Sequence, residues 1–292
     1  FHTPVGIALF GTKLIVSQNT WLVNIAVADG DVTVKVGTGI SGRLDGAKGT
    51  ATISAYGVAA DSTGVVYFAQ QSSYSVRKID SADHTTTVAG TGAAGSSDNA
   101  IGVWAEFNSP TDVSVGPGDY LYVTMYGSGG AIRLVAPDGV VTTLLTTGAS
   151  PFNKAVGLDQ NAAGHLYVAG FDTHQVHAYQ TTPPAVPTAS GSAPSLAAQS
   201  WVAGSGATGN ADGTRLVAEF QSPRGMAFDI SGDLMVGEDH GRRVRRITPL
   251  GRVFTFAGDG TNAHADGIRT AASFGGALDV AVDAAGSMFV PE

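Results

Sequence analysis

The chain has 292 residues, 43% hydrophobic and only 14% charged, which excludes intrinsic disorder because a disordered chain has few apolar residues and a high net charge. No run of 18 apolar residues occurs, so we expect no membrane insertion, and the net charge of −8 disfavours nucleic acid as a partner. The chain contains no cysteine, which excludes disulfides, thiol catalysis and zinc–thiolate sites.

A short motif recurs along the chain about every 50 residues. Two copies share the pattern A-E-F-x-S-P: residues 105–113 read A-E-F-N-S-P-T-D-V and residues 218–226 read A-E-F-Q-S-P-R-G-M. The equivalent anchor positions of all copies are Gly6, Gly57, Asp112, Gly157, Gly225 and Asp279. A repeat of this length is typical of propellers, solenoids and arrays.

Each repeat holds four short apolar or Thr-rich runs. In the second repeat they are residues 58–60, 65–69, 76–79 and 85–90, and they are bounded by Gly, Asp or Ser. Short β-branched runs between such turn residues predict strands, and no stretch shows a sustained helical period. Four antiparallel strands per repeat predict a propeller blade.

We therefore predict an all-β fold, a six-bladed β-propeller of four-stranded antiparallel blades, forming a single domain over residues 1–292. The predicted blades span approximately residues 1–53, 54–107, 108–152, 153–220, 221–274 and, in part, 275–292. The last blade holds only two strand-like runs, 278–283 and 287–290. We expect either that the chain is a fragment or that a segment from elsewhere or another chain completes the sixth blade after Val290.

The fourth repeat is the longest because residues 181–199 form a Pro-, Ser- and Thr-rich insertion. Its composition predicts an extended surface loop between the third and fourth strands of that blade. Two interpretations stay open, namely an O-glycosylated or partner-binding arm, and a tolerated insertion without a function of its own.

Residues 236–247 read V-G-E-D-H-G-R-R-V-R-R-I, and residues 251–260 read G-R-V-F-T-F-A-G-D-G, followed by Asp266-Gly267. Together with weaker copies at residues 88–92 and 202–206, this pattern resembles the NHL-repeat family of β-propellers. The resemblance implies a propeller but no single function, because NHL propellers include lyases, hydrolases, RNA-binding proteins and extracellular adhesion modules. The amidating-lyase branch uses zinc-binding histidines and disulfides, so its activity is not expected here.

The seven histidines show no metal-ligand pattern. His174 and His177 are three residues apart, which on a strand places them on opposite faces, and the others are scattered through turns. The recurring acidic residues Asp45, Asp98, Asp212 and Asp266 supply too few carboxylates per loop for calcium. We interpret them as caps of backbone N–H groups in their own loops, and we expect no metal and no cofactor.

The most polar cluster is Glu238, Asp239, His240 and Arg242, in the predicted loop between the second and third strands of blade five. With Tyr74 and Tyr126 on other rim loops, these residues are our candidate binding residues. The cluster has the groups for anion binding or acid–base chemistry, but no G-x-S-x-G context is present, so no catalytic residue is assigned. The alternative is that Asp239 and Arg245 form ion pairs within the blade.

Taken together, these patterns favour a non-enzymatic interaction or structural module. We expect it to be the propeller domain of a larger extracellular or cell-surface protein that mediates protein or glycan contacts or assembly. One alternative is a hydrolase or lyase acting at the central rim. A second is a glycan-binding, lectin-like propeller that uses aromatics such as Trp104, Tyr74 and Tyr126. The arginines of residues 242–246 alternate between strand faces, so an RNA site is disfavoured.

Overall fold

The computed structural model describes residues 3–127, 130–145, 151, 154–182 and 195–292. The described residues up to 145 form one compact unit, and those from 151 onward form a second. We call them unit one and unit two. The described residues contain no helix that is both long enough and apolar enough to cross a membrane.

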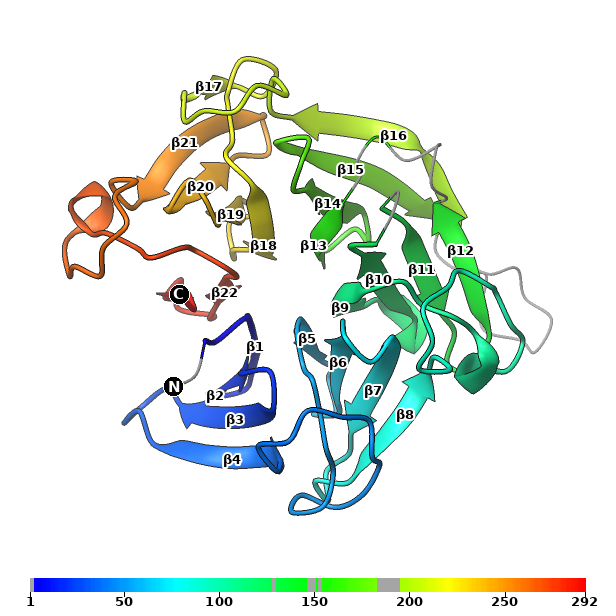
Figure 1. Cartoon of the computed structure of the whole chain (residues 1–292). Coiled ribbons are helices and arrows are strands. Elements are labelled where there is room, and N and C mark those ends of the chain that lie inside the picture. Colours follow the sequence, from blue (N-terminus) through cyan, green and yellow to red (C-terminus); the bar gives the residue numbers. More distant parts are fainter. Residues whose placement is uncertain (1–2, 128–129, 146–150, 152–153, 183–194) are drawn as a thin grey trace. The chain divides into compact units, whose positions relative to one another are not determined.

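Unit one contains three antiparallel sheets, each built from four strands that follow one another in sequence (Figure 1). The strands are β1 (Gly6–Phe10), β2 (Lys13–Ser17), β3 (Trp21–Ala26), β4 (Val32–Gly37), β5 (Val58–Ala60), β6 (Val66–Gln70), β7 (Ser75–Ile79), β8 (Thr85–Ala89), β9 (Pro110–Val115), β10 (Leu121–Met125), β11 (Ile132–Val135) and β12 (Val141–Leu145). These sheets are blades one, two and three of the predicted series.

Unit two contains blades four and five and a two-stranded sheet. The strands are β13 (Ala155–Gln160), β14 (Leu166–Gly170), β15 (Gln175–Thr182), β16 (Ser195–Ala203), β17 (Gly213–Thr214), β18 (Pro223–Phe228), β19 (Leu234–Glu238), β20 (Arg243–Ile247), β21 (Arg252–Ala257), β22 (Ala281–Val282) and β23 (Met288–Phe289). Blade five consists of β18 to β21, and β17, from the loop that precedes it, pairs with its outer strand β21.

The predicted all-β class is confirmed, with five blades of antiparallel strands. The helical elements of the described residues are three short 3₁₀ turns, η1 (Gly102–Trp104), η2 (Pro117–Asp119) and η3 (Arg269–Ala271). The sheet β22–β23 lies where the partial sixth blade is predicted, and the count of six blades stays a prediction.

The predicted insertion, residues 181–199, is wrong at its two ends. Strand β15 continues to Thr182 and β16 already begins at Ser195, and the two pair with Thr182 opposite Ser195. The β-branched and hydroxyl side chains of this stretch suit a strand as well as a loop, so composition alone misplaces the boundary. The middle of the insertion, residues 183–194, lies outside the described residues.

The hydrophobic core fills the space between neighbouring sheets within a unit. Ile15 and Leu22 of blade one pack in one cluster with Val58 and Phe68 of blade two, and all four side chains are buried. At Gly57, an added Cβ would overlap the side chain of Asp112, so the absence of a side chain lets the first strands of blades two and three approach.

Blades two, three and five each contain a fully buried arginine on the third strand: Arg77, Arg133 and Arg245. A buried guanidinium is strongly destabilising unless it is paired and its donors are satisfied. In blade three, the Arg133 Nη2 atom lies 2.8 Å from Asp98 Oδ1, and Nη1 donates to the carbonyl of Glu106 at 2.7 Å. The guanidinium also lies over the ring of Phe107, 5.1 Å from its centroid.

The acidic partner connects this arginine to the outer strand of the same blade. Asp98 accepts hydrogen bonds from the backbone N–H and the hydroxyl of Thr143 on β12, at 3.0 and 2.8 Å. The carboxylate therefore ties the loop before the blade to its third and fourth strands. We call such a set an arginine clamp, and the three clamps are Arg77–Asp45–Thr87, Arg133–Asp98–Thr143 and Arg245–Asp212–Thr255.

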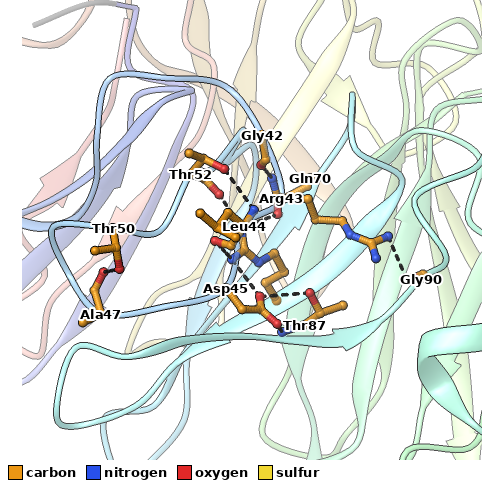
Figure 2. A network of polar contacts seen from close by, with 11 residues as sticks. Gly42, Arg43, Leu44, Asp45, Ala47, Thr50, Thr52, Gln70, Thr87 and Gly90 are labelled. Carbon is orange, nitrogen blue, oxygen red and sulfur yellow. Dashed lines mark hydrogen bonds and ion pairs between the residues drawn. The ribbon is translucent and has the colours of Figure 1, made fainter.

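Figure 2 shows the clamp of blade two from close by, where the carboxylate of Asp45 contacts Thr87. Arg77 donates to this carboxylate at 2.8 Å, to the carbonyl of Leu44 at 2.8 Å and to Gln70 Oε1 at 3.0 Å. Burial lowers the pKa of the Arg77 guanidinium, and the charge and hydrogen bond of Asp45 act against that shift. The clamp thus keeps a charged group stable inside the blade.

The clamps correct one sequence-based interpretation. Asp45, Asp98 and Asp212 do accept backbone N–H groups, but these N–H groups belong to Thr87, Thr143 and Thr255, far along the chain, and not to the aspartates' own loops. The main partner of each aspartate is a buried arginine. The repeat places both partners correctly, but spacing alone does not show that they meet.

We predict that Arg133→Met lowers the free energy of unfolding by about 2–4 kcal/mol, because it leaves two carbonyls without their donor and removes the ion pair of Asp98. Urea-induced unfolding followed by tryptophan fluorescence measures the loss. Arg252→Met, which replaces an exposed arginine on β21 outside the clamp, is the control and should change stability by less than about 0.5 kcal/mol. Equal losses in the two variants would contradict a special role of the clamp.

Candidate functional site

The predicted polar cluster forms one turn of unit two. Glu238 is the last residue of β19, and Asp239, His240 and Arg242 lead into β20. Arg242 has a positive φ of 52°, and its Nη1 donates to the carbonyl of His240 at 3.2 Å. The turn therefore presents His240 on the surface while Glu238 points into the blade.

Glu238 is fully buried, and its two carboxylate oxygens have different surroundings. Oε1 accepts the backbone N–H of Gln221 at 2.8 Å and lies 3.5 Å from Nη1 of Arg245. Oε2 has no hydrogen-bond partner within the described residues. Burial raises the pKa of the Glu238 carboxyl to about 7, although Arg245 and the N–H of Gln221 oppose the shift.

Two histidines from neighbouring turns meet at Ser222. The Ser222 hydroxyl lies 2.8 Å from Nδ1 of His240, and the Ser222 backbone N–H donates to Nδ1 of His174 at 3.1 Å. Because Nδ1 of His174 accepts this bond, its ring proton is on Nε2 when the ring is neutral. Burial lowers the pKa of His174; Asp172 raises it, and His240 lowers it further.

Phe171 and Lys154 lie at the border of this cluster. The ring of Phe171 contacts His240 edge-on, with the ring centroids 5.6 Å apart, and Lys154 Nζ lies over the Phe171 ring, 5.9 Å from its centroid. Lys154 also pairs with Asp172 at 3.1 Å. The arrangement supplies an aromatic side chain, a cation and imidazole groups on one small surface, which suits binding of a polar ligand.

The alternative interpretation, that Asp239 and Arg245 form ion pairs within the blade, is confirmed, although the two residues do not pair with each other. Asp239 instead pairs with Arg224 of β18 at 2.9 Å, and Arg245 pairs with Asp212 and Glu238. Both predicted residues are therefore in ion pairs within blade five, but with other partners. The reason is the pleat, because adjacent residues such as Glu238 and Asp239 point to opposite sides of the chain.

Tyr74 and Tyr126 lie in the loops between the second and third strands of blades two and three, so they belong to unit one. Both are half-buried. Tyr74 has a positive φ of 49°, the same backbone conformation as His174 and Arg242 at the equivalent positions of blades four and five. The structure thus brings Glu238, Asp239, His240 and Arg242 together in one turn and places the tyrosines on equivalent turns of other blades.

Among the residues that the structure describes, no three His, Asp or Glu side chains converge as metal ligands. A pocket of about 380 Å³ lies in unit one between blades one and two, and its lining includes Lys13, Lys35, Asn24 and Ile15. Lys35 also pairs with Asp83 at 3.0 Å. None of the predicted site residues lines this pocket.

Sequence reasoning missed Ser222 and His174 as neighbours of His240. The signal was available in the repeat, because His174 and Arg242 occupy the same position in successive blades, and Ser222 belongs to the S-P pair that opens a blade. Only a placement of the blades beside one another shows that these positions meet.

We predict that Glu238→Gln removes a pH-dependent loss of stability. A carboxyl whose folded pKa is raised contributes stability that is complete below its unfolded pKa, near 4.5, and lost as the pH rises through about 7. Relative to the variant, the free energy of unfolding of the wild type should therefore fall by roughly 3 kcal/mol between pH 4.5 and 8, since one unit of pKa shift corresponds to ~1.4 kcal/mol. Urea unfolding at a series of pH values measures this difference.

Glu219→Gln is the matched control, since it removes a carboxylate from the neighbouring loop without touching the buried site. A difference between Glu238→Gln and the wild type that stays constant over this pH range would contradict the prediction.

Comparison with known proteins gives the fold. No protein-family model and no curated protein matches the chain. A solved Bacteroides thetaiotaomicron protein of unknown function superposes with a TM-score of 0.70 at 20% identity, covering 100% of this chain and 67% of that one. An auxiliary nutrient binding protein from the same species gives 0.69 at 15% identity, covering 99% and 66%.

A gluconolactonase from Xanthomonas campestris superposes with a TM-score of 0.63 at 15% identity, covering 99% of this chain and 82% of that one. The chain thus spans about two thirds of the length of the two Bacteroides proteins. At these identities the likeness concerns the fold alone, and it shows an all-β propeller with five blades of antiparallel strands.

Proposed function

We propose that the chain is a non-enzymatic interaction module, the propeller domain of a larger extracellular or cell-surface protein. The observation that carries this proposal is a set of exposed apolar side chains in the loops that lead from one blade to the next. In unit one, Ile101, Val103 and Trp104 are consecutive or nearly so in the loop around η1, and Trp104 is 62% exposed.

Unit two repeats the pattern. Leu216 and Val217 are exposed in the loop before blade five, and Ile268, in the loop before β22, is 86% exposed. Single exposed apolar residues need no explanation, but their recurrence in three of the described loops between blades favours a contact role for these loops. Aromatic residues such as Trp104 are also enriched at the centres of protein interfaces.

The rest of the surface supports contact with proteins or glycans in an extracellular setting. The chain carries few charges, and its nutrient-binding and unknown-function neighbours are longer proteins in which the matched region is one part. The polar groups of the β19–β20 turn are engaged in bonds within the blade, as Glu238, Asp239 and Arg245 show. These bonds stabilise the blade, so the arrangement of the polar groups needs no bound substrate to explain it.

A hydrolase is the second candidate, and the contact between Ser222 and His240 favours it. A hydroxyl 2.8 Å from an imidazole nitrogen is the geometry of a nucleophile and its base. The Ser222 residue is only 4% exposed, however, so a substrate carbonyl has little access to its hydroxyl in this conformation. The resemblance in fold to a gluconolactonase is compatible with this candidate but does not distinguish it.

We expect the full chain to show no turnover of p-nitrophenyl esters or of aldonolactones above a heat-denatured sample. The variants Ser222→Ala and His240→Ala separate a true activity from contamination. Turnover in the wild type that both variants abolish would overturn the non-enzymatic proposal and establish the hydrolase.

We also expect a photo-crosslinking residue at position 104 to capture a specific partner from the cells and medium of the producing organism. The same residue at position 230, which replaces an exposed isoleucine in the turn after β18, is the control. Excess unlabelled wild-type protein should suppress the product, whereas excess Val103→Ser/Trp104→Ser protein should not. Equal products from both positions, or suppression by both competitors, would contradict a contact surface at this loop.

A further inference from the structure

The loop that precedes β22 contains one half of a fourth arginine clamp. One and the same sequence offset separates Asp266 from Asp212, Phe274 from Phe220 and Ser273 from Glu219. Phe274 and Ser273 therefore correspond to the ring and the carbonyl that hold Arg245 in blade five.

The backbone of this half-clamp shares one hydrogen bond with the occupied clamps, and the Ser273 carbonyl also accepts the N–H of Ala265 at 3.3 Å. Ser273 donates its N–H to the carbonyl of Ala265 at 3.0 Å, as Glu219 does to Ala211 and Glu106 to Ser97, each at 3.0 Å. In the occupied clamps the carbonyls of Ala211 and Ser97 also accept the buried arginine. The acceptor atoms for a guanidinium are thus already positioned around Asp266.

Glu292 is a further acceptor at a corresponding position, and its Oε1 lies 3.2 Å from Nδ1 of His264. Oε2 of Glu292 accepts a hydrogen bond from the N–H of Gly275 at 2.9 Å. In the same way, Oε1 of Glu238 accepts one from the N–H of Gln221 at 2.8 Å. Gln70, at the same position in blade two, accepts from Arg77. Asp266 itself has no hydrogen bond or ion pair within the described residues, in contrast to Asp45, Asp98 and Asp212.

The donor half of this clamp is not among the described residues. In each clamp the arginine lies on a third strand and the threonine on a fourth, but among the described residues β23 pairs with β22 alone. Phe274, Met288 and Val290 beside this edge are half-buried members of the local apolar cluster. An unpaired strand edge next to apolar side chains is a template for strand addition.

We propose that β23 binds a partner β-hairpin whose first strand carries an arginine that enters this half-clamp. The pairing of Val123 with Arg133 and of Val236 with Arg245 places that arginine opposite Val290. Two positions later the strand carries an aliphatic residue, as Val135 and Ile247 do, opposite Met288. The second strand carries a threonine that donates to Asp266, as Thr143 does to Asp98.

The chemistry of the site selects arginine over lysine. The planar guanidinium in each occupied clamp donates at the same time to a carboxylate and to two backbone carbonyls while its face lies on a ring or near one. A lysine ammonium is a point charge on a flexible stem and has no planar face. This inference rests on the proposed function, since it specifies one partner segment of an interaction module.

The chain itself supplies the probe for a test. A fluorescein-labelled peptide with the sequence of residues 243–257, R-V-R-R-I-T-P-L-G-R-V-F-T-F-A, reproduces β20 and β21 with their arginine and threonine. Fluorescence anisotropy with the full chain should show saturable binding. Gln in place of the arginine at the position of Arg245, or Asp266→Asn in the protein, should each weaken binding at least tenfold, and the two changes together should weaken it little more than either alone.

A second arm removes the need for the free peptide to fold. The full chain is extended after Glu292 by the sequence of residues 239–257, which is the segment that follows the equivalent Glu238 in blade five. The extension should raise the Tm and protect the backbone amides of residues 288–290 from hydrogen exchange. The same extension with the arginine changed to Gln should lose both effects.

Asp266→Asn and Asp98→Asn form a matched pair in the unextended chain. Asp98→Asn, which breaks an occupied clamp, should lower the Tm, whereas Asp266→Asn should leave it unchanged. The proposal is overturned if neither the peptide nor the extension binds at β23, or if binding is the same with Gln as with Arg. Either result leaves the crosslinking at position 104 unaffected, so the failure of this inference is distinguishable from failure of the proposed function.

Discussion

The burial of a guanidinium inside blades two, three and five is the constraint on which much of the structure depends. Each buried arginine requires a carboxylate and carbonyl acceptors, and the loop before the blade supplies most of them. The neighbouring strand adds Gln70 in blade two and Glu238 in blade five. The loops are therefore held in one conformation although they lie at the surface. Blades one and four have Val23 and His177 at the register positions that the buried arginines occupy in the other three blades.

Much of the fold was predictable from the sequence because the repeat supplies several independent copies of the same evidence. Alternating apolar runs and turn residues located the strands of blades two, three and five, and the all-β class followed from them. The ends of the insertion were not predictable, since Thr181 and Ser195 suit strand and loop equally. The partners of Asp45, Asp98 and Asp212 were also missed, because an aspartate that bonds its own turn and one that pairs with a distant arginine look the same in a single sequence.

The candidate site was predictable only as a list of neighbours in one turn. Sequence proximity grouped Glu238, Asp239, His240 and Arg242, but the pleat separates them into a buried carboxylate, an ion-paired aspartate and an exposed imidazole. Ser222 and His174 reach His240 from other segments. Some residues of this polar cluster therefore stabilise the blade, and others lie on the surface. Exposed apolar residues such as Trp104 indicate a contact site more strongly than this cluster does.

The order of the clamp residues along the chain has a consequence for how such a protein can arise. Asp98 precedes Arg133, which precedes Thr143, and the same order holds from Asp45 to Thr87 and from Asp212 to Thr255. All parts of a clamp thus lie within one continuous stretch of sequence. Duplication of that single stretch of gene copies a blade together with the interactions that stabilise it, so blade number can change by whole steps without any new pairing having to evolve.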